Sequence, residues 1–185
     1  MRKLLAWNMI TLDGYFEGAQ PWDLSFHSTV WGPELEAMSR QQLEGDTTLI
    51  FGRRTYEGMA AYWPTASDEG EVAVRMNAVP KIVVSNTLTS ADWNNTRVLN
   101  GGAAQTIAAL KGEEGGDLYV FGSAQLLDSL LAAGLVDEYR LCLTPVVQGR
   151  GTPLFKPAEE PKNWTLLEAR ALQTGGVVLR YRVKG

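Results

Sequence analysis

The stretch Gly116-Asp117-Leu118-Tyr119-Val120-Phe121-Gly122-Ser123-Ala124-Gln125-Leu126-Leu127 decides the fold of this chain. Four consecutive apolar residues, 118–121, are typical of a strand that is buried on both faces. After Gly122, apolar residues recur at helical spacing as far as Leu131, which predicts a helix. A strand, a glycine turn and a helix form the unit in which backbone N–H groups can bind phosphate, and Ser123 is placed to cap that helix. Taken alone, the same unit is also a common tight turn that binds nothing.

The same order of strand, polar junction and helix recurs along the rest of the chain. We expect strands over 3–10, 47–51, 80–84 and 96–99, a long strand over 136–147, and helices over 33–43, 71–78 and 103–110. We expect a loop over 16–32 and a last hairpin formed by 164–172 and 176–183. Strands that alternate with helices predict an α/β fold with a mostly parallel central sheet, helices on both faces and an antiparallel C-terminal hairpin.

Length and composition narrow the class of protein. A chain of 185 residues with 45% hydrophobic and 21% charged residues is typical of one globular domain over 1–185. The net charge is 17 − 21 = −4, so we expect no nucleic acid partner. Because no run is long enough to span a bilayer and no signal pattern is present, we expect a cytoplasmic protein without a membrane partner. With one Cys and one His we expect no metal site, and Cys142 is expected to be an inert buried thiol.

Three of the expected strands end in segments that suit a phosphate-bearing ligand. These segments are Gly52-Arg53-Arg54-Thr55, Ser85-Asn86-Thr87 and Gly122-Ser123-Ala124. In a parallel sheet a ligand lies across the carboxyl ends of the strands, where these segments converge. The convergence favours a phosphate site over a set of unrelated turns.

Three motifs carry a resemblance to known families. Leu49-Ile50-Phe51-Gly52-Arg53-Arg54-Thr55-Tyr56 resembles the Gly-Arg-x-Thr motif of dihydrofolate reductases. Thr11-Leu12-Asp13-Gly14-Tyr15 resembles the Ser-x-Asp-Gly turn of the related riboflavin-biosynthesis reductases, the RibD C-terminal domain family, and residues 145–155 are similar to its Pro-x-x-x-Gly-x-Gly-x-Pro-Leu-Phe signature. The matches cover 3–183 in order. The resemblance implies the dihydrofolate reductase fold, an NADPH-dependent reductase and a homodimer.

The resemblance also assigns residues to NADPH. Arg53, with Arg54 beside it, would pair with the adenosine 2′-phosphate, which Ser85 and Asn86 would also face. The remaining cofactor residues would hold the pyrophosphate from two sides: Gly52 and Thr55 on one, and Gly122, Ser123, Ala124, Gln125 and Leu126 on the other. Both families usually have Gly-Gly where this chain has Gly122-Ser123.

The substrate side is assigned by the same resemblance, with alternatives left open. Glu36 matches the carboxylate that assists pterin protonation, but Glu34 and Glu36 also suit the positive end of a helix. Asp13 could orient an amide or relay a proton, or it could form an Asx-turn. The other expected residues are Thr144 on the long strand facing the substrate, Trp22 in a loop over the nicotinamide, and Arg150, which meets a substrate phosphate or lies in a dimer-facing turn, with Lys156 as a weaker second cation.

Two further groups of side chains can be explained either by a role in the site or by ordinary solvation and packing. His27, the only histidine, is expected to be solvated. The aromatic residues could wall a pocket for a flat ring or simply pack in the core: Trp31, Tyr56, Tyr62 and Trp63. Together these features favour an NADPH-dependent reductase of a flat nitrogen heterocycle, a riboflavin-pathway pyrimidine or a pterin. The alternatives are a dihydrofolate reductase proper that uses Glu36, a non-catalytic NADP-binding module, and an unrelated α/β protein.

Overall fold

The structure is a computed structural model that describes residues 1–157 and 160–183. Its strands are β1 Leu4–Ile10, β2 Tyr15–Glu17, β3 Thr48–Gly52, β4 Lys81–Val84, β5 Thr96–Leu99, β6 Leu118–Phe121, β7 Glu138–Leu143, β8 Thr152–Pro153, β9 Trp164–Ala171 and β10 Val177–Val183. Its α-helices are α1 Pro33–Gln42, α2 Arg53–Tyr62, α3 Gly70–Ala78, α4 Ala103–Gly112 and α5 Ala124–Ala132. Short 3₁₀ helices cover Ser25–Thr29, Trp63–Thr65 and Ser67–Glu69.

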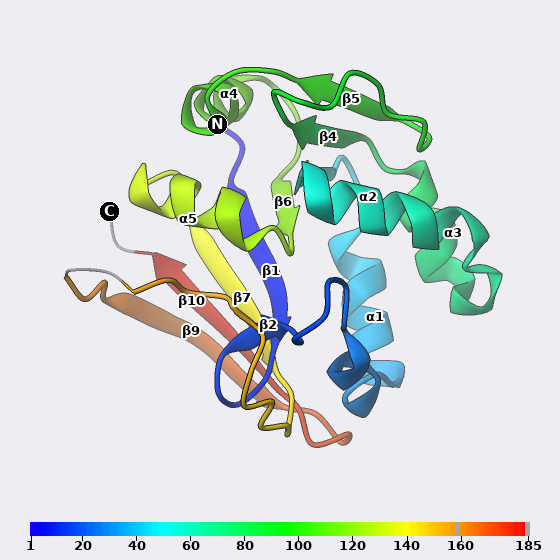
Figure 1. Cartoon of the computed structure of the whole chain (residues 1–185), viewed down its shortest axis with the longest axis vertical. Helices are drawn as coiled ribbons and strands as arrows, with labels where there is room; N and C mark the ends of the chain where they lie inside the picture. Colours follow the sequence, from blue (N-terminus) through cyan, green and yellow to red (C-terminus); the bar gives the residue numbers. More distant parts are fainter. Residues whose placement is uncertain (158–159, 184–185) are drawn as a thin grey trace.

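The main sheet has the strand order β5-β4-β3-β6-β1-β7-β10-β9 (Figure 1). Every neighbouring pair from β5 to β7 is parallel. The strand β10 is antiparallel to both of its neighbours, β7 and β9. The C-terminal hairpin is formed by β9 and β10. The expected mostly parallel sheet with an antiparallel C-terminal end is therefore confirmed.

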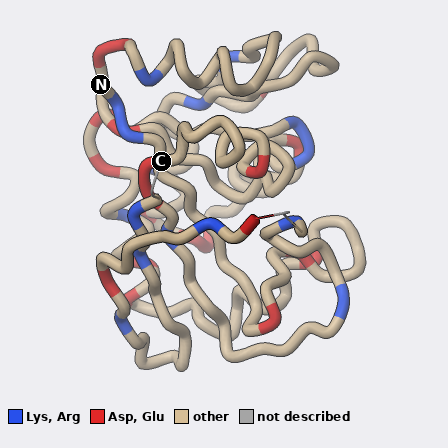
Figure 2. The backbone as a smooth tube through the Cα atoms, turned by 90° about the vertical axis from the view of Figure 1, so that its left-hand side faces the viewer, with Lys and Arg blue, Asp and Glu red and all other residues tan. Residues whose placement is uncertain are grey.

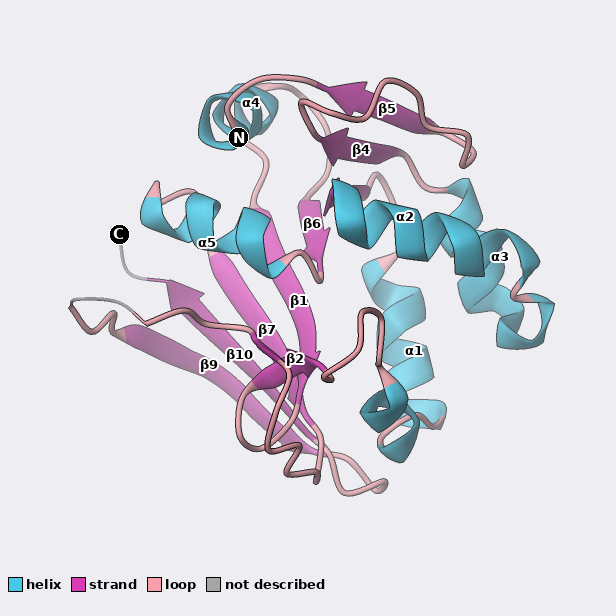
Figure 3. Ribbon diagram, in the orientation of Figure 1, coloured by secondary structure: helices cyan, strands magenta, loops and turns pink. Residues whose placement is uncertain are grey.

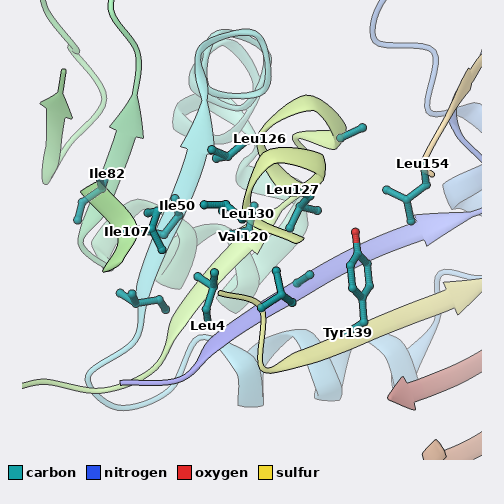
Figure 4. Packing of buried hydrophobic residues seen from close by; sticks show 14 of the residues in the cluster. Leu4, Ile50, Ile82, Ile107, Val120, Leu126, Leu127, Leu130, Tyr139 and Leu154 are labelled. Atoms are coloured by element: carbon teal, nitrogen blue, oxygen red, sulfur yellow. The ribbon is translucent and has the colours of Figure 1, made fainter. Parts of the chain in front are cut away.

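Helices cover both faces of this sheet (Figure 3). On one face, Ile50 and Val120 pack with α4 and α5, whose side chains point at the strands in Figure 4. On the other face, Leu49 and Phe51 pack with residues of α2 and α3. Because consecutive residues of β3 point to opposite buried faces, the strand is apolar without interruption.

Two expected elements differ from the structure. The strand expected over 136–147 spans only Glu138–Leu143, because Pro145 has no N–H with which to continue the ladder, although the Thr144 N–H still donates to the Ile10 carbonyl at 2.8 Å. The segment 16–32, expected to be a loop, contains most of β2 and the 3₁₀ helix Ser25–Thr29. The strand β2 pairs with β8, which is 135 residues further along the chain at Glu17 and Thr152, so no local pattern predicts it.

Three further observations concern the thiol, the helices and the charged side chains of the described residues. Cys142 is buried, and burial raises the pKa of its thiol to about 11, so it is unreactive. No helix among residues 1–157 and 160–183 is long and apolar enough to cross a membrane. The same residues contain no cluster of three or more side chains of the types that ligate metals. Acidic and basic residues are both scattered over the backbone in the view of Figure 2.

Candidate functional site

A cavity of about 1150 Å³ lies at the carboxyl ends of β3, β6 and β1. One group of lining residues comes from the starts of two helices, 52–55 at α2 and 122–126 at α5. A second group is aromatic or sulfur-containing and comes from the loop before α1, from α2, from the 3₁₀ helix that follows α2 and from α3: Trp31, Met59, Tyr62, Trp63 and Met76. The cavity thus has a polar part with free helix ends and a part suited to a flat ring.

The two helix starts have no side-chain cap. Gly52 and Ser123 occupy the N-cap positions of α2 and α5, and neither makes a side-chain hydrogen bond to the first turn. The expectation that Ser123 caps α5 is therefore wrong. Its hydroxyl oxygen instead accepts a hydrogen bond from the Gly52 N–H at 3.0 Å. The first-turn N–H groups of both helices are thus left for an anion.

Gly122 and Ser123 both adopt the left-handed backbone conformation. Their φ angles are 60° and 59°, and a Cβ atom at Gly122 would lie 3.1 Å from Cγ2 of Thr55. Gly122 therefore allows the α5 junction to approach the α2 junction closely. Ser123 adopts a conformation that glycine reaches more easily, so its backbone is strained at this position.

Two guanidinium groups stand at the start of α2. Arg53 makes one long ion pair with Glu57, at 3.6 Å, with both side chains about half exposed. Arg54 makes no ion pair within 1–157 and 160–183. Both arginines line the cavity, where their charge adds to that of the helix end.

The structure brings together ten of the sixteen residues that the resemblance assigns to the cofactor, the substrate or catalysis. The cavity is lined by Trp22, Gly52, Arg53, Arg54, Thr55, Gly122, Ser123, Ala124, Gln125 and Leu126. Six others are outside the lining: Asp13, Glu36, Ser85, Asn86, Thr144 and Arg150.

Ser85 and Asn86 stabilise the turn after β4. The Ser85 hydroxyl accepts from the N–H groups of Thr87 and Leu88. The side-chain amide oxygen of Asn86 accepts from the Gly101 N–H at 2.6 Å. These bonds stay within the turn and its neighbour, so neither side chain reaches the cavity in this structure.

Asp13 joins the turn after β1 to the loop after β7. Its carboxylate accepts hydrogen bonds from the Thr11 hydroxyl at 2.6 Å and from the N–H groups of Gln148 and Gly149 at 3.0 and 2.7 Å. The Thr11 hydroxyl, followed by these backbone donors, lowers the pKa of Asp13 to about 2. The N–H two residues on, that of Tyr15, donates to the Thr11 hydroxyl oxygen, so the expected Asx-turn is not formed. The carboxylate instead links two loops that are distant in sequence, which favours a structural role for Asp13 over a proton relay.

The remaining expected substrate residues have other partners. Glu36 pairs with Arg40 at 3.9 Å on the surface of α1, and Glu34 accepts from the Gln173 N–H at 2.7 Å. Thr144 is fully buried, and Arg150 is exposed. Lys156 pairs with Asp128 at 2.9 Å.

Comparison with known proteins now identifies the family. The sequence profile described as the RibD C-terminal domain matches residues 2–178. The chain belongs to the RibD C-terminal domain family. An uncharacterised relative, YyaP of Bacillus subtilis, is 28% identical over 187 residues, which is 100% of this chain and 96% of the relative.

Two solved structures share the fold of this RibD C-terminal domain. A candidate riboflavin biosynthesis protein of Shewanella sp. PV-4 superposes with a TM-score of 0.77 at 20% identity and 99% coverage of both chains. Dihydrofolate reductase of Enterococcus faecalis, in complex with NADP(H) and an inhibitor, gives 0.66 at 15% identity, with 99% of this chain and 97% of that chain covered. Family and fold together support a reductase of the RibD or dihydrofolate reductase type.

The lining of this RibD C-terminal domain also contains polar residues that the sequence did not assign to a site, among them Glu17, His27 and Thr152. The expectation that His27 is solvated holds only in part: its ring is half-buried and packs edge-on against Phe26, with the ring centroids 4.8 Å apart, and burial lowers its pKa to about 4. The imidazole is therefore neutral at pH 7. Glu17 and Thr152 belong to β2 and β8, two strands too short to give a sequence signal.

Proposed function

We propose that this RibD C-terminal domain is an NADPH-dependent reductase that transfers a hydride to a flat nitrogen heterocycle, a pyrimidine of the riboflavin-pathway type or a pterin. The observation that carries the proposal is the pair of uncapped helix starts, joined through Ser123 and Gly52, that line one cavity with two arginines. The family and the NADP(H)-bound neighbour of the same fold support it. A homodimer, which the resemblance implies, and a cytoplasmic location, which the composition of the chain leads us to expect, belong to the same proposal.

The residues present suit a dinucleotide with a 2′-phosphate. The N–H groups at the starts of α2 and α5 would bind the pyrophosphate, since each helix end carries partial positive charge. Arg53 would pair with the 2′-phosphate, because a planar guanidinium matches phosphate oxygens in two places, and Arg54 would add a second charge. NADPH bound there would supply the hydride, while the protein supplies binding and orientation.

The aromatic part of the cavity would take the heterocycle. Trp31, Tyr62 and Trp63 offer flat faces, and the thioethers of Met59 and Met76 adapt to a ring edge. Burial in such a pocket aligns the electrophilic carbon with the hydride donor and excludes water. Glu36 has no role in this proposal, because it lies outside the lining and pairs with Arg40. The site therefore supports a pyrimidine or pterin reductase in general more than a dihydrofolate reductase proper that uses Glu36.

Reduction also needs a proton. The three carboxylates of the lining already have partners: Glu17 accepts from the Trp22 N–H, Glu57 pairs with Arg53, and Glu69 accepts from the Tyr62 hydroxyl. We therefore assign delivery of the proton to solvent that enters the cavity.

A screen of NADPH oxidation tests this function. The purified chain is mixed with NADPH and a panel of aminopyrimidines and pterins, and the loss of reduced nicotinamide is followed by absorbance. Oxidation that depends on one heterocycle supports the reductase. Binding of NADPH without oxidation for any member of the panel indicates the non-catalytic NADP-binding module, and no binding at all overturns the proposal.

A further inference from the structure

Trp22 has a strained backbone. Its φ angle is 66°, in the left-handed region, and within the described chain only Asn95 and Ser123 share this among residues other than glycine. A bulky residue persists there only when its surroundings hold it in place. The side chain lines the cavity and is 38% exposed, so one side of the indole faces the interior and the other faces solvent.

The carboxylate of Glu17 is hydrogen-bonded to the backbone of Trp22. One oxygen, Oε1, accepts a hydrogen bond from the backbone N–H of Trp22 at 2.6 Å, and the other, Oε2, accepts from the Thr152 hydroxyl at 3.0 Å. Glu17 and Thr152 are also paired in the ladder between β2 and β8. At Gly151 a Cβ atom would lie 2.2 Å from the Glu17 carbonyl oxygen, so the two strands approach very closely. The carboxylate is therefore fixed on a short two-stranded ribbon.

The indole of Trp22 reaches across to α2. A Cβ atom built at Gly58 would lie 2.5 Å from ring atoms Cε3 and Cζ3 of Trp22, so the ring rests directly on the helix backbone. Gly58 lies one turn beyond Arg54 on the same helix. Only a residue without a side chain allows this contact, which accounts for a glycine in the middle of a helix, where it is otherwise unfavourable.

We propose that Glu17 is a positioning residue of the reductase site, which acts by holding Trp22 on Gly58 and so closes the cavity over its ligand. The inference rests on the proposed function in taking that ligand to be NADPH. Glu17 acts through Trp22 and Thr152, since both carboxylate oxygens are occupied by these two donors. Neither Glu57 nor Glu69 has this role, because their partners are Arg53 and Tyr62.

The position of Trp22 can be measured without any ligand. Acrylamide quenching of Trp22 fluorescence is obtained for each variant by subtracting the same variant with Trp22→Phe. Glu17→Ala should raise the quenching constant. Glu17→Gln should keep it at the wild-type value, because the Gln oxygen accepts from the backbone N–H of Trp22 and the Gln amide group can hydrogen-bond to the Thr152 hydroxyl. Gly58→Ala should raise quenching with Glu17 intact, and Glu57→Ala is the matched control. Equal quenching in wild type and Glu17→Ala would overturn the proposal.

A second arm measures the effect on the ligand. The dissociation constant for NADPH should rise about tenfold in Glu17→Ala, the size expected for one charge-assisted hydrogen bond, and should stay near the wild-type value in Glu17→Gln. If the wild type does not bind NADPH, the proposed function fails, while the quenching arm still decides whether Glu17 positions Trp22. If Glu17→Ala frees Trp22 and NADPH binds unchanged, closure over the ligand is wrong.

Discussion

The hydroxyl oxygen of Ser123 accepts a hydrogen bond from the backbone N–H of Gly52 at 3.0 Å, across 71 residues of sequence. This contact joins the two strand-to-helix junctions that line the cavity. Ser123 makes it from a left-handed backbone conformation that a glycine would adopt without strain. The serine therefore supplies a hydrogen bond between the two junctions, and its backbone is strained in the left-handed conformation that this requires.

Replacing Ser123 tests this link. We expect Ser123→Ala to lower the free energy of unfolding by about 1 kcal/mol or more, because the Gly52 N–H loses its partner and the strained backbone remains. Urea unfolding measures the change. Ser129→Ala, which removes an exposed hydroxyl bonded only to the carbonyl of Gln125 in the same helix, is the control and should have little effect. Equal losses for both variants would mean that the contact to Gly52 contributes nothing specific.

Replacing Arg53 tests the cofactor assignment. Arg53→Ala should weaken NADPH by about 1.5–3 kcal/mol, the value of a hydrogen bond to a charged group, and should leave NADH nearly unchanged because NADH lacks the 2′-phosphate. Paired titrations of both nucleotides measure the selectivity. The companion Arg54→Ala shows whether the second guanidinium shares the phosphate. A similar loss for NADPH and NADH in Arg53→Ala would contradict the assignment.

Asp13 should make stability depend on acid pH. Its folded pKa is lowered to about 2 from an ordinary value of 3.8, so its contribution to stability is complete above pH 4 and is lost as the pH falls towards 2. Asp13→Asn should therefore be less stable than wild type at pH 6, and the two proteins should converge as the pH falls through that window. Urea midpoints at several pH values measure the convergence, with Asp68→Asn as the control. A gap that stays constant down to pH 2 would show that ionisation of Asp13 is not involved.

His27 should make stability depend on pH in a higher range than Asp13 does. Burial lowers its pKa to about 4 from 6.5, so the unfolded chain takes up a proton before the folded chain does, and stability falls as the pH drops from about 6.5 to 4. Because His27 is the only histidine, His27→Gln should remove this fall. Thermal unfolding across the window measures it. The same slope in both proteins would place its origin elsewhere.

Local patterns predicted the parts of the fold that depend on neighbouring residues. The apolar runs at 47–51 and 118–121, each followed by glycine and helical spacing, predicted β3, β6 and the helix starts that meet at the cavity. The end of β7 was misplaced because the apolar residues after Pro145 continue the pattern while the proline ends the ladder. Apolar character alone does not show where hydrogen bonding stops.

The contacts that complete the site are long-range and had no local signal. Glu17 meets Thr152 across β2 and β8, and the Ser123 hydroxyl finds a partner outside its own helix. His27 lies in a polar segment, so only the fold shows that its ring is half-buried and packs against Phe26. One residue did carry a usable signal: Gly58 inside a helix is unfavourable unless another group needs the space, here the indole of Trp22.

The measurement that tests the central claim most directly is a parallel titration of NADPH and NADH into the purified wild-type protein, followed by nicotinamide fluorescence. We expect saturable binding of NADPH with much weaker binding of NADH, because two arginines at an uncapped helix start suit the 2′-phosphate. Absence of binding by either nucleotide would contradict the assignment of this cavity to NADPH.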